Sequence, residues 1–167
     1  MRPSYLRLWL IVLFIFLLTI IVLPYPFSNL RPLWVFLFVL YVQVTLPRVF
    51  YVMGVVFFGL MLDVLSLSAL GQHLLALTLV SWCIAGRARR FKFFSMSQQM
   101  VWVFLLSFMY QWTLFVSNIV LGYSMSTWSM LLPVCMTTLV WPWFKLCVEY
   151  FLLSPLSRKR RYILNEE

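Results

Sequence analysis

Six long apolar stretches follow one another along the 167 residues, and the basic residues gather at every second junction between them. Eleven of the thirteen Lys and Arg residues lie before the first stretch or after the second, fourth and sixth. With 64% hydrophobic and 10% charged residues, the chain is far more apolar than a soluble protein. The pattern therefore predicts an all-α integral membrane protein.

The length of the chain limits the number of crossings. A bilayer core of about 30 Å needs roughly 20 apolar residues for each helix, so six helices fit with short turns left over. We expect a six-transmembrane-helix bundle with spans at about residues 6–23, 33–46, 50–65, 71–86, 99–121 and 128–153. Residues 1–157 would form one polytopic membrane domain, and residues 158–167 a basic, disordered cytoplasmic tail.

The prolines and charges refine this topology. Pro32 suits the first turn of the second span, and Pro133 and Pro142 predict a kink in the last one. Under the positive-inside rule, both termini are cytoplasmic. A re-entrant segment at residues 49–62 would instead give five spans. Residues 1–23 resemble a signal peptide, but Pro24-Tyr25-Pro26 offers no small-residue cleavage site, so we expect a retained helix.

Several classes of function are disfavoured by composition. The net charge of +9 lies in loops and tails and forms no basic face, so nucleic acid is not the expected partner. Membrane lipid is. Cys83, Cys135 and Cys147 are widely spaced in apolar stretches and are interpreted as small core side chains. With one histidine, His73, the chain has no multi-histidine metal site, and we expect neither a metal nor a cofactor.

Asp63 is the most informative polar residue, because it is the only acid before Glu149 and stands at the end of an apolar stretch. Acids in membrane segments usually face a cavity or a partner. Asp63 has three interpretations: hydrogen bonding to nearby groups such as Ser66 and Ser68, contact with a partner or ligand, or acid-base chemistry with His73. No catalytic triad, phosphate loop or paired carboxylate accompanies it, so we expect no catalytic residues and no enzyme.

Two charge pairs follow from the spacing. Arg31 opens the second span on the side where the third span ends, so it could pair with Asp63 and lock the two spans together. Lys145 and Glu149 are four residues apart in the last span and are expected to neutralise each other on one helix face.

Three aromatic and glycine features mark candidate contacts. Trp34 follows Arg31-Pro32 as an interfacial anchor. Gly54 and Gly59 allow another helix backbone to approach. Trp141-Pro142-Trp143 is expected to shape a bundle wall or a groove for another helix.

Three motifs in order carry a family resemblance: Arg31-Pro32-x-Trp34, then Gly59-x-x-x-Asp63-x-x-Ser66-x-Ser68-x-Leu70-Gly71-x-His73-x-Leu75, and Trp141-Pro142-Trp143. Together they resemble the rod shape-determining protein MreD family over nearly the whole chain. Leu67 is a departure, since many relatives have glycine there.

The resemblance implies a non-catalytic scaffold of the bacterial inner (cytoplasmic) membrane, within the elongation (rod) complex that builds lateral peptidoglycan and maintains cell shape. MreC is the direct partner it implies, with MreB, RodZ, RodA and its transpeptidase partner reached through the assembly. The fold it implies is similar to the substrate-binding subunits of energy-coupling-factor transporters. The protein could also form a homo-oligomer, which the sequence leaves open. A module that binds or transports a small solute is the alternative.

The residues expected to bind a partner or stabilise the structure are Arg31, Pro32, Trp34, Gly59, Asp63, Ser66, Gly71, His73, Trp141, Pro142 and Trp143. A partner helix would lie in a groove lined by the second, third or sixth span.

Overall fold

The computed structural model describes residues 5–20, 31–45, 48–91, 93–123 and 127–164, and all regular secondary structure in these ranges is helical. The helices are α1 (Tyr5–Ile20), α2 (Trp34–Thr45), α3 (Arg48–Leu65), α4 (Gln72–Ala85), α5 (Ala88–Phe91), α6 (Met96–Val120) and α7 (Thr127–Leu164). Each of the six predicted spans overlaps one of the longer helices. The one-turn helix α5 was not predicted.

Helix ends differ from the predicted ones for local reasons. The carbonyl of Leu33 accepts the first helical bond of α2, from the N–H group of Leu37. Pro32 therefore precedes the cap of the helix, whereas the sequence predicted that it would lie in the first turn. Helix α6 begins earlier than predicted because Ser95 and Gln98 form a capping box. Residues 158–164 continue α7, so the prediction of a disordered tail is wrong there. Arg, Lys and Leu all favour a helix that has already begun.

Helices α3 and α7 are continuous. Helix α3 runs without interruption from Arg48 to Leu65, so the chain does not turn back within residues 49–62 as a re-entrant segment would. Helix α7 passes through Pro133 and Pro142 without a break. The hydroxyl of Thr137 donates to the carbonyl of Pro133 at 2.6 Å, one turn before it, on the same helix.

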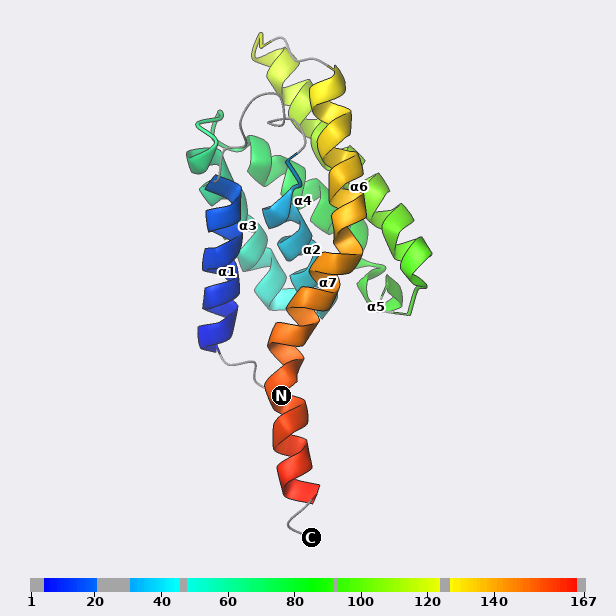
Figure 1. The fold of residues 1–167 in the computed structure, drawn as a ribbon. Helices are drawn as coiled ribbons and strands as arrows, with labels where there is room; N and C mark the ends of the chain where they lie inside the picture. The colour runs from blue at the N-terminus through cyan, green and yellow to red at the C-terminus, as the bar shows by residue number, and fades with distance from the viewer. Residues whose placement is uncertain (1–4, 21–30, 46–47, 92, 124–126, 165–167) are drawn as a thin grey trace.

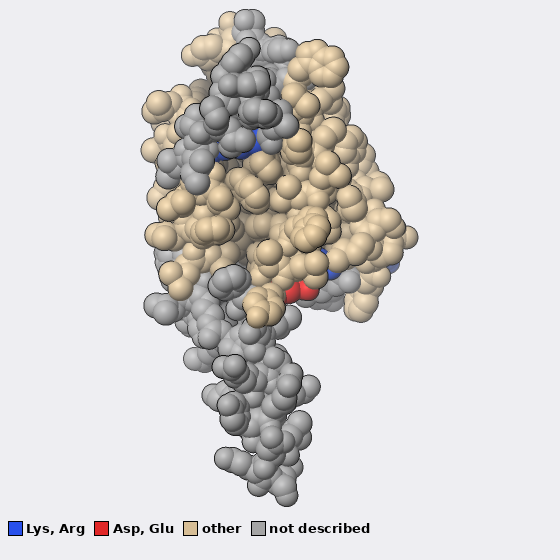
Figure 2. Space-filling model, in the orientation of Figure 1, with Lys and Arg blue, Asp and Glu red and all other residues tan. Residues whose placement is uncertain are grey.

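The outer surface is apolar. Met96–Val120 and the Met130–Tyr150 part of α7 are long and apolar enough to cross a membrane, and shorter apolar helices cover Leu10–Thr19, Trp34–Thr45, Val52–Leu65 and Gln72–Ala85. Figure 2 shows almost no charged atoms among the described residues on the visible face of the molecule. These features are consistent with a helical membrane protein, and the count of six crossings stays a prediction.

Helix α2 lies at the centre of the bundle. It contacts α1, α3, α4, α5 and α7, and every side chain from residue 35 to residue 41 is buried. A helix that is apolar all round is expected in such a place. Figure 1 shows the outer helices around it, with the start of α1 and the end of α7 at the same end of the bundle.

Two of the three cysteines depart from their predicted place in the core, whereas Cys83 packs against it. Cys83 is half-buried, whereas Cys135 and Cys147 are exposed on the outward side of α7. Cysteine behaves as a small, weakly polar side chain, so it can be exposed at these positions without a packing partner.

Gly59 permits the close packing of α3 on α4. A Cβ atom added to Gly59 would lie 2.7 Å from the Cα atom of Leu74, which is backbone and cannot rotate away. The predicted close approach is therefore present at Gly59. It is absent at Gly54, where an added Cβ atom would meet only the ring of Phe58, at 3.9 Å.

We expect Gly59→Ala to lower the free energy of unfolding by about 1–3 kcal/mol, because the two helices must separate. Gly54→Ala is the matched control in the same helix, and it should be neutral or stabilise by roughly 0.5–1 kcal/mol through helix propensity. Thermal unfolding of the purified variants in one detergent measures both. Equal shifts would contradict the close contact.

Candidate functional site

The corner between α3 and α4 is built around Asp63. Helix α3 ends at Leu65, a turn follows, and α4 begins at Gln72. Gly71 adopts φ 99°, a left-handed conformation that side chains disfavour, and it offers no side chain to cap α4. The cap must come from elsewhere in the chain.

The carboxylate of Asp63 supplies that cap. It is 1% exposed and accepts hydrogen bonds from the backbone N–H groups of Gly71 and His73, both at 2.8 Å. The Ser68 hydroxyl donates to it at 3.3 Å. A negative charge is favourable here because the first N–H groups of a helix lack intrahelical acceptors and carry a partial positive charge. Of the three interpretations, the structure supports hydrogen bonding.

Ser66 and His73 do not complete a catalytic group with Asp63. Ser66 is exposed, and its backbone N–H continues the helical bonding by donating to the carbonyl of Leu62. The ring of His73 lies 2.7 Å from the hydroxyl of Tyr110 in α6, measured from Nδ1. His73 therefore meets Asp63 through its backbone and α6 through its side chain.

The start of α2 is fixed to α7. The N–H group of Leu33 donates to the Thr137 hydroxyl at 3.0 Å, and Thr137 is wholly buried. This bond places the segment of Arg31, Pro32 and Trp34 against the last helix.

The proposed Arg31–Asp63 ion pair is not formed. Asp63 instead accepts three hydrogen bonds, from Ser68, Gly71 and His73, and no described residue forms an ion pair with Arg31. Partial burial lowers the pKa of the Arg31 guanidinium below its ordinary value. The bond from Leu33 to Thr137, and not a charge pair, holds this end of α2.

The two tryptophans on either side of Pro142 differ in burial: one lies inside the helix bundle and the other on its surface. Trp141 is buried, packs edge-on against Phe91 with ring centroids 6.0 Å apart, and donates from its indole N–H to Gln99 at 3.4 Å. Trp143 is 73% exposed. The bundle wall that the motif predicts is formed by Trp141 alone.

Gln99 joins three segments at the other end of the bundle. Its amide group donates to the carbonyls of Phe91 and Phe94, at 3.4 and 3.0 Å. Its side-chain oxygen accepts from Trp141 and, at 3.1 Å, from the Lys145 ammonium.

The predicted ion pair between Lys145 and Glu149 is wrong. Lys145 donates to Gln99 of α6, and no salt bridge to Glu149 forms among the described side chains. A cation satisfied by an amide of a neighbouring helix fastens two helices, whereas the predicted pair would have stabilised only one.

Sequence reasoning missed Gln99, Thr137 and Tyr110. Each is a polar group in a largely apolar stretch, next to another polar residue (Gln98, Thr138 and Gln111), and that polarity was the available signal. Polar residues in membrane helices commonly hydrogen-bond across helices. Their partners could not be identified from sequence, because they lie 37 to 104 positions away.

No group of three His, Cys, Asp or Glu residues in the described ranges could hold a metal ion. The buried polar groups at both ends of the bundle instead connect helices, as Gln72 of α4 and Asn118 of α6 do at 3.4 Å. The site is structural in its local chemistry, and the outward helix faces are left as surfaces for other molecules.

Leu67 provides a test of the corner. It has φ 49°, the left-handed region that glycine adopts without strain, and its side chain is 94% exposed. We expect Leu67→Gly to raise the free energy of unfolding by about 1 kcal/mol, because the strain is relieved without loss of packing. Thermal unfolding in detergent measures the change.

Leu70→Gly is the matched control, since Leu70 is 79% exposed in the same turn and does not have a positive φ. It should give no stabilisation, because glycine gains freedom in the unfolded chain without relieving strain. Stabilisation by both substitutions would mean that the conformation of Leu67 is not the cause.

Comparison with known proteins agrees with the resemblance seen in the motifs. The family model described as rod shape-determining protein MreD matches residues 3–151. No solved structure matches the chain, so the fold likeness to energy-coupling-factor transporter subunits stays a prediction. The match covers most of the 167 residues. The chain thus belongs to the rod shape-determining protein MreD family, a family of membrane proteins that determine cell shape.

Proposed function

We propose that this protein is a non-catalytic scaffold of the elongation complex, which binds the transmembrane helix of MreC and couples lateral peptidoglycan synthesis to the MreB cytoskeleton. RodZ, RodA and its transpeptidase partner would be reached through this assembly. The protein would lie in the inner membrane with both termini in the cytoplasm.

The observation that carries this proposal is the use of the buried polar groups. Asp63 caps α4, the ring of His73 contacts Tyr110, and Gln99 joins α6 to α7 and to the segment around α5. General acid-base catalysis needs two groups free to exchange protons with a substrate. Groups engaged in holding helices together support a scaffold.

A solute-binding module is supported less well. It would require a polar cavity beside Asp63 and His73, but Asp63 is inaccessible and the His73 ring is already bonded. A cavity of about 500 Å³ lies at the opposite end of α4, beside Gly86 and Arg87. Its position does not fit the predicted solute site.

The structure narrows the surface available to a partner helix. A groove lined by α2 is supported less well, because residues 35–41 are enclosed by the other helices. Of the predicted helices, α3 and α7 have outward faces. We place the contact on α7, where Cys135, Leu139 and Trp143 lie about one turn apart on one side of the helix and are all exposed.

Two features favour this row on α7. The small side chain of Cys135 lies one turn before the larger Leu139, which lets a second helix approach closely at that point. The face is also held in a fixed direction, because Trp141 and Lys145 bind Gln99 on the inner side of the same helix. Rigid presentation reduces the entropy lost on binding.

Co-purification with MreC tests the proposal. Wild-type protein solubilised in mild detergent should retain MreC, and Trp143→Ala should reduce the retained amount by about tenfold, as expected for a large aromatic side chain at the centre of a contact. Trp112→Ala in α6 is the matched control, since Trp112 is also exposed, at 52%. It should retain MreC as the wild type does.

Unfolding temperatures of both variants separate binding from stability. If the Trp143→Ala variant retained MreC, the contact would lie on another surface, for example on α3, and the proposed row on α7 would be wrong. Failure of the wild type to retain MreC, together with a bound small molecule in the purified protein, would favour the solute-binding alternative.

A further inference from the structure

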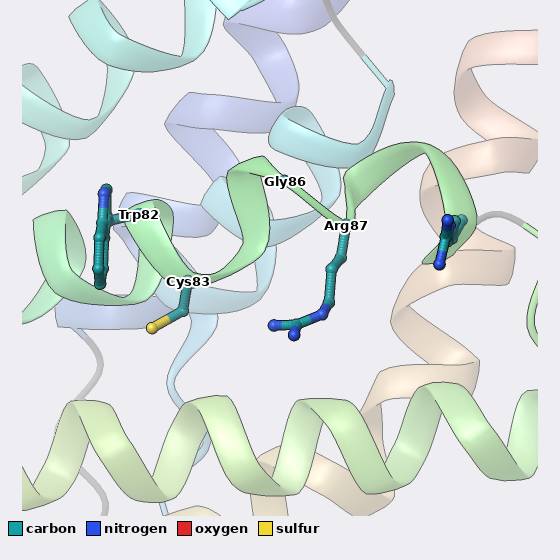
Figure 3. A pocket seen from close by; sticks show the side chains of 5 residues that line it. Trp82, Cys83, Gly86 and Arg87 are labelled. Atoms are coloured by element: carbon teal, nitrogen blue, oxygen red, sulfur yellow. The ribbon is translucent and has the colours of Figure 1, made fainter.

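A cleft opens where α4 ends and the short helix α5 begins. It has a volume of about 500 Å³ and is lined by Trp82, Cys83, Gly86, Arg87 and Arg90. Figure 3 shows the side chains of Cys83 and Arg87 extending to the same side of the chain, toward a neighbouring helix. None of these residues takes part in the polar contacts of the candidate site.

The cleft carries positive charge that no acidic side chain offsets. Arg87 and Arg90 are exposed, and no described carboxylate forms a salt bridge with either. The Arg87 guanidinium lies 5.4 Å from the ring centre of Trp102 in α6, a cation–π distance. This contact holds the guanidinium at the mouth of the cleft while its N–H groups remain able to donate.

The other wall of the cleft is apolar. Trp82 is 79% exposed, and it lies with Cys83 in the last turns of the apolar helix α4. The lining therefore changes from apolar to cationic over about one helical turn. A free anion would use only the arginines, whereas an amphipathic anion would contact both parts.

The position of the cleft agrees with such a ligand. Arg87 and Arg90 belong to the basic cluster that predicts a cytoplasmic end for α4. The cytoplasmic leaflet contains anionic lipids, and basic clefts between membrane helices on that side bind lipid headgroups. Exposed tryptophan favours the same headgroup layer.

From this geometry we propose that the cleft binds the phosphate-bearing headgroup of an anionic phospholipid, with an acyl chain beside Trp82. Arginine suits this task because its planar guanidinium donates two parallel hydrogen bonds to a phosphate. The bound lipid would connect α4, α5 and α6 at the membrane surface. This inference does not depend on the binding of MreC.

Native mass spectrometry of the full-length protein tests the proposal. The protein is released from micelles to which phosphatidylglycerol or phosphatidylcholine has been added, and bound lipid is counted. We expect the wild type to retain phosphatidylglycerol in preference to phosphatidylcholine. The double variant Arg87→Gln/Arg90→Gln should lower its affinity for phosphatidylglycerol by about fivefold for each arginine removed.

A second double variant, Arg158→Gln/Arg161→Gln, removes the same charge from the end of α7 and is the matched control. It should keep the wild-type affinity. An equal loss in the control would show that attraction by overall charge, without a site, explains retention, and unchanged retention in the cleft variant would overturn the proposal outright.

Competition distinguishes the source of the phosphate. Millimolar inorganic phosphate should not displace the lipid, because it lacks the acyl chain that contacts Trp82. Displacement by inorganic phosphate would show a simple anion site, and displacement by an acidic peptide without any lipid preference would show a protein-binding surface. Either result would overturn the lipid proposal.

Discussion

The bond between the Asp63 carboxylate and the start of α4 is the constraint on which the arrangement of the helices depends. It ties the end of α3 to the first N–H groups of α4, and the tight turn keeps the two helices side by side. That proximity is possible because Gly59 has no side chain to separate them. Helix α4 then presents His73 to α6 and encloses α2 from one side. A buried acid in a membrane protein is costly unless it is fully bonded, and here the helix terminus provides the bonds.

The two ends of the bundle are held by different chemistry. At one end a carboxylate meets backbone N–H groups, and at the other Gln99 gathers bonds from α7 and from the segment around α5. Most other contacts are apolar, around the buried α2, although the Gln43 amide of α2 also donates to the buried Ser81 hydroxyl of α4. Lipid tails are as apolar as the core, so apolar burial alone does little to select one arrangement of helices in a membrane. The few polar bonds between helices therefore carry much of the specificity of the fold.

The difference between the buried polar groups and the exposed helix faces is relevant to function. The buried polar groups bond one helix to another, while side chains on the outward faces of α7 and of the α4 end are exposed. One face is apolar and suits a helix, and the other adds positive charge and suits a lipid headgroup. For a shape-determining membrane protein, we propose that these faces are the means of acting on an assembly.

Much of the fold could be predicted from the sequence, because hydrophobic length and charge position do not depend on partners far along the chain. These features gave the helical class, the six helical stretches and the importance of Asp63, and the motifs identified the family. The pairing of side chains could not be predicted. Arg31 and Lys145 each had a plausible carboxylate nearby in the proposed topology, yet Asp63 is occupied by a helix terminus and Lys145 by Gln99. Only the tertiary structure decides such choices, because a polar group in an apolar interior bonds to the nearest suitable donor or acceptor in space.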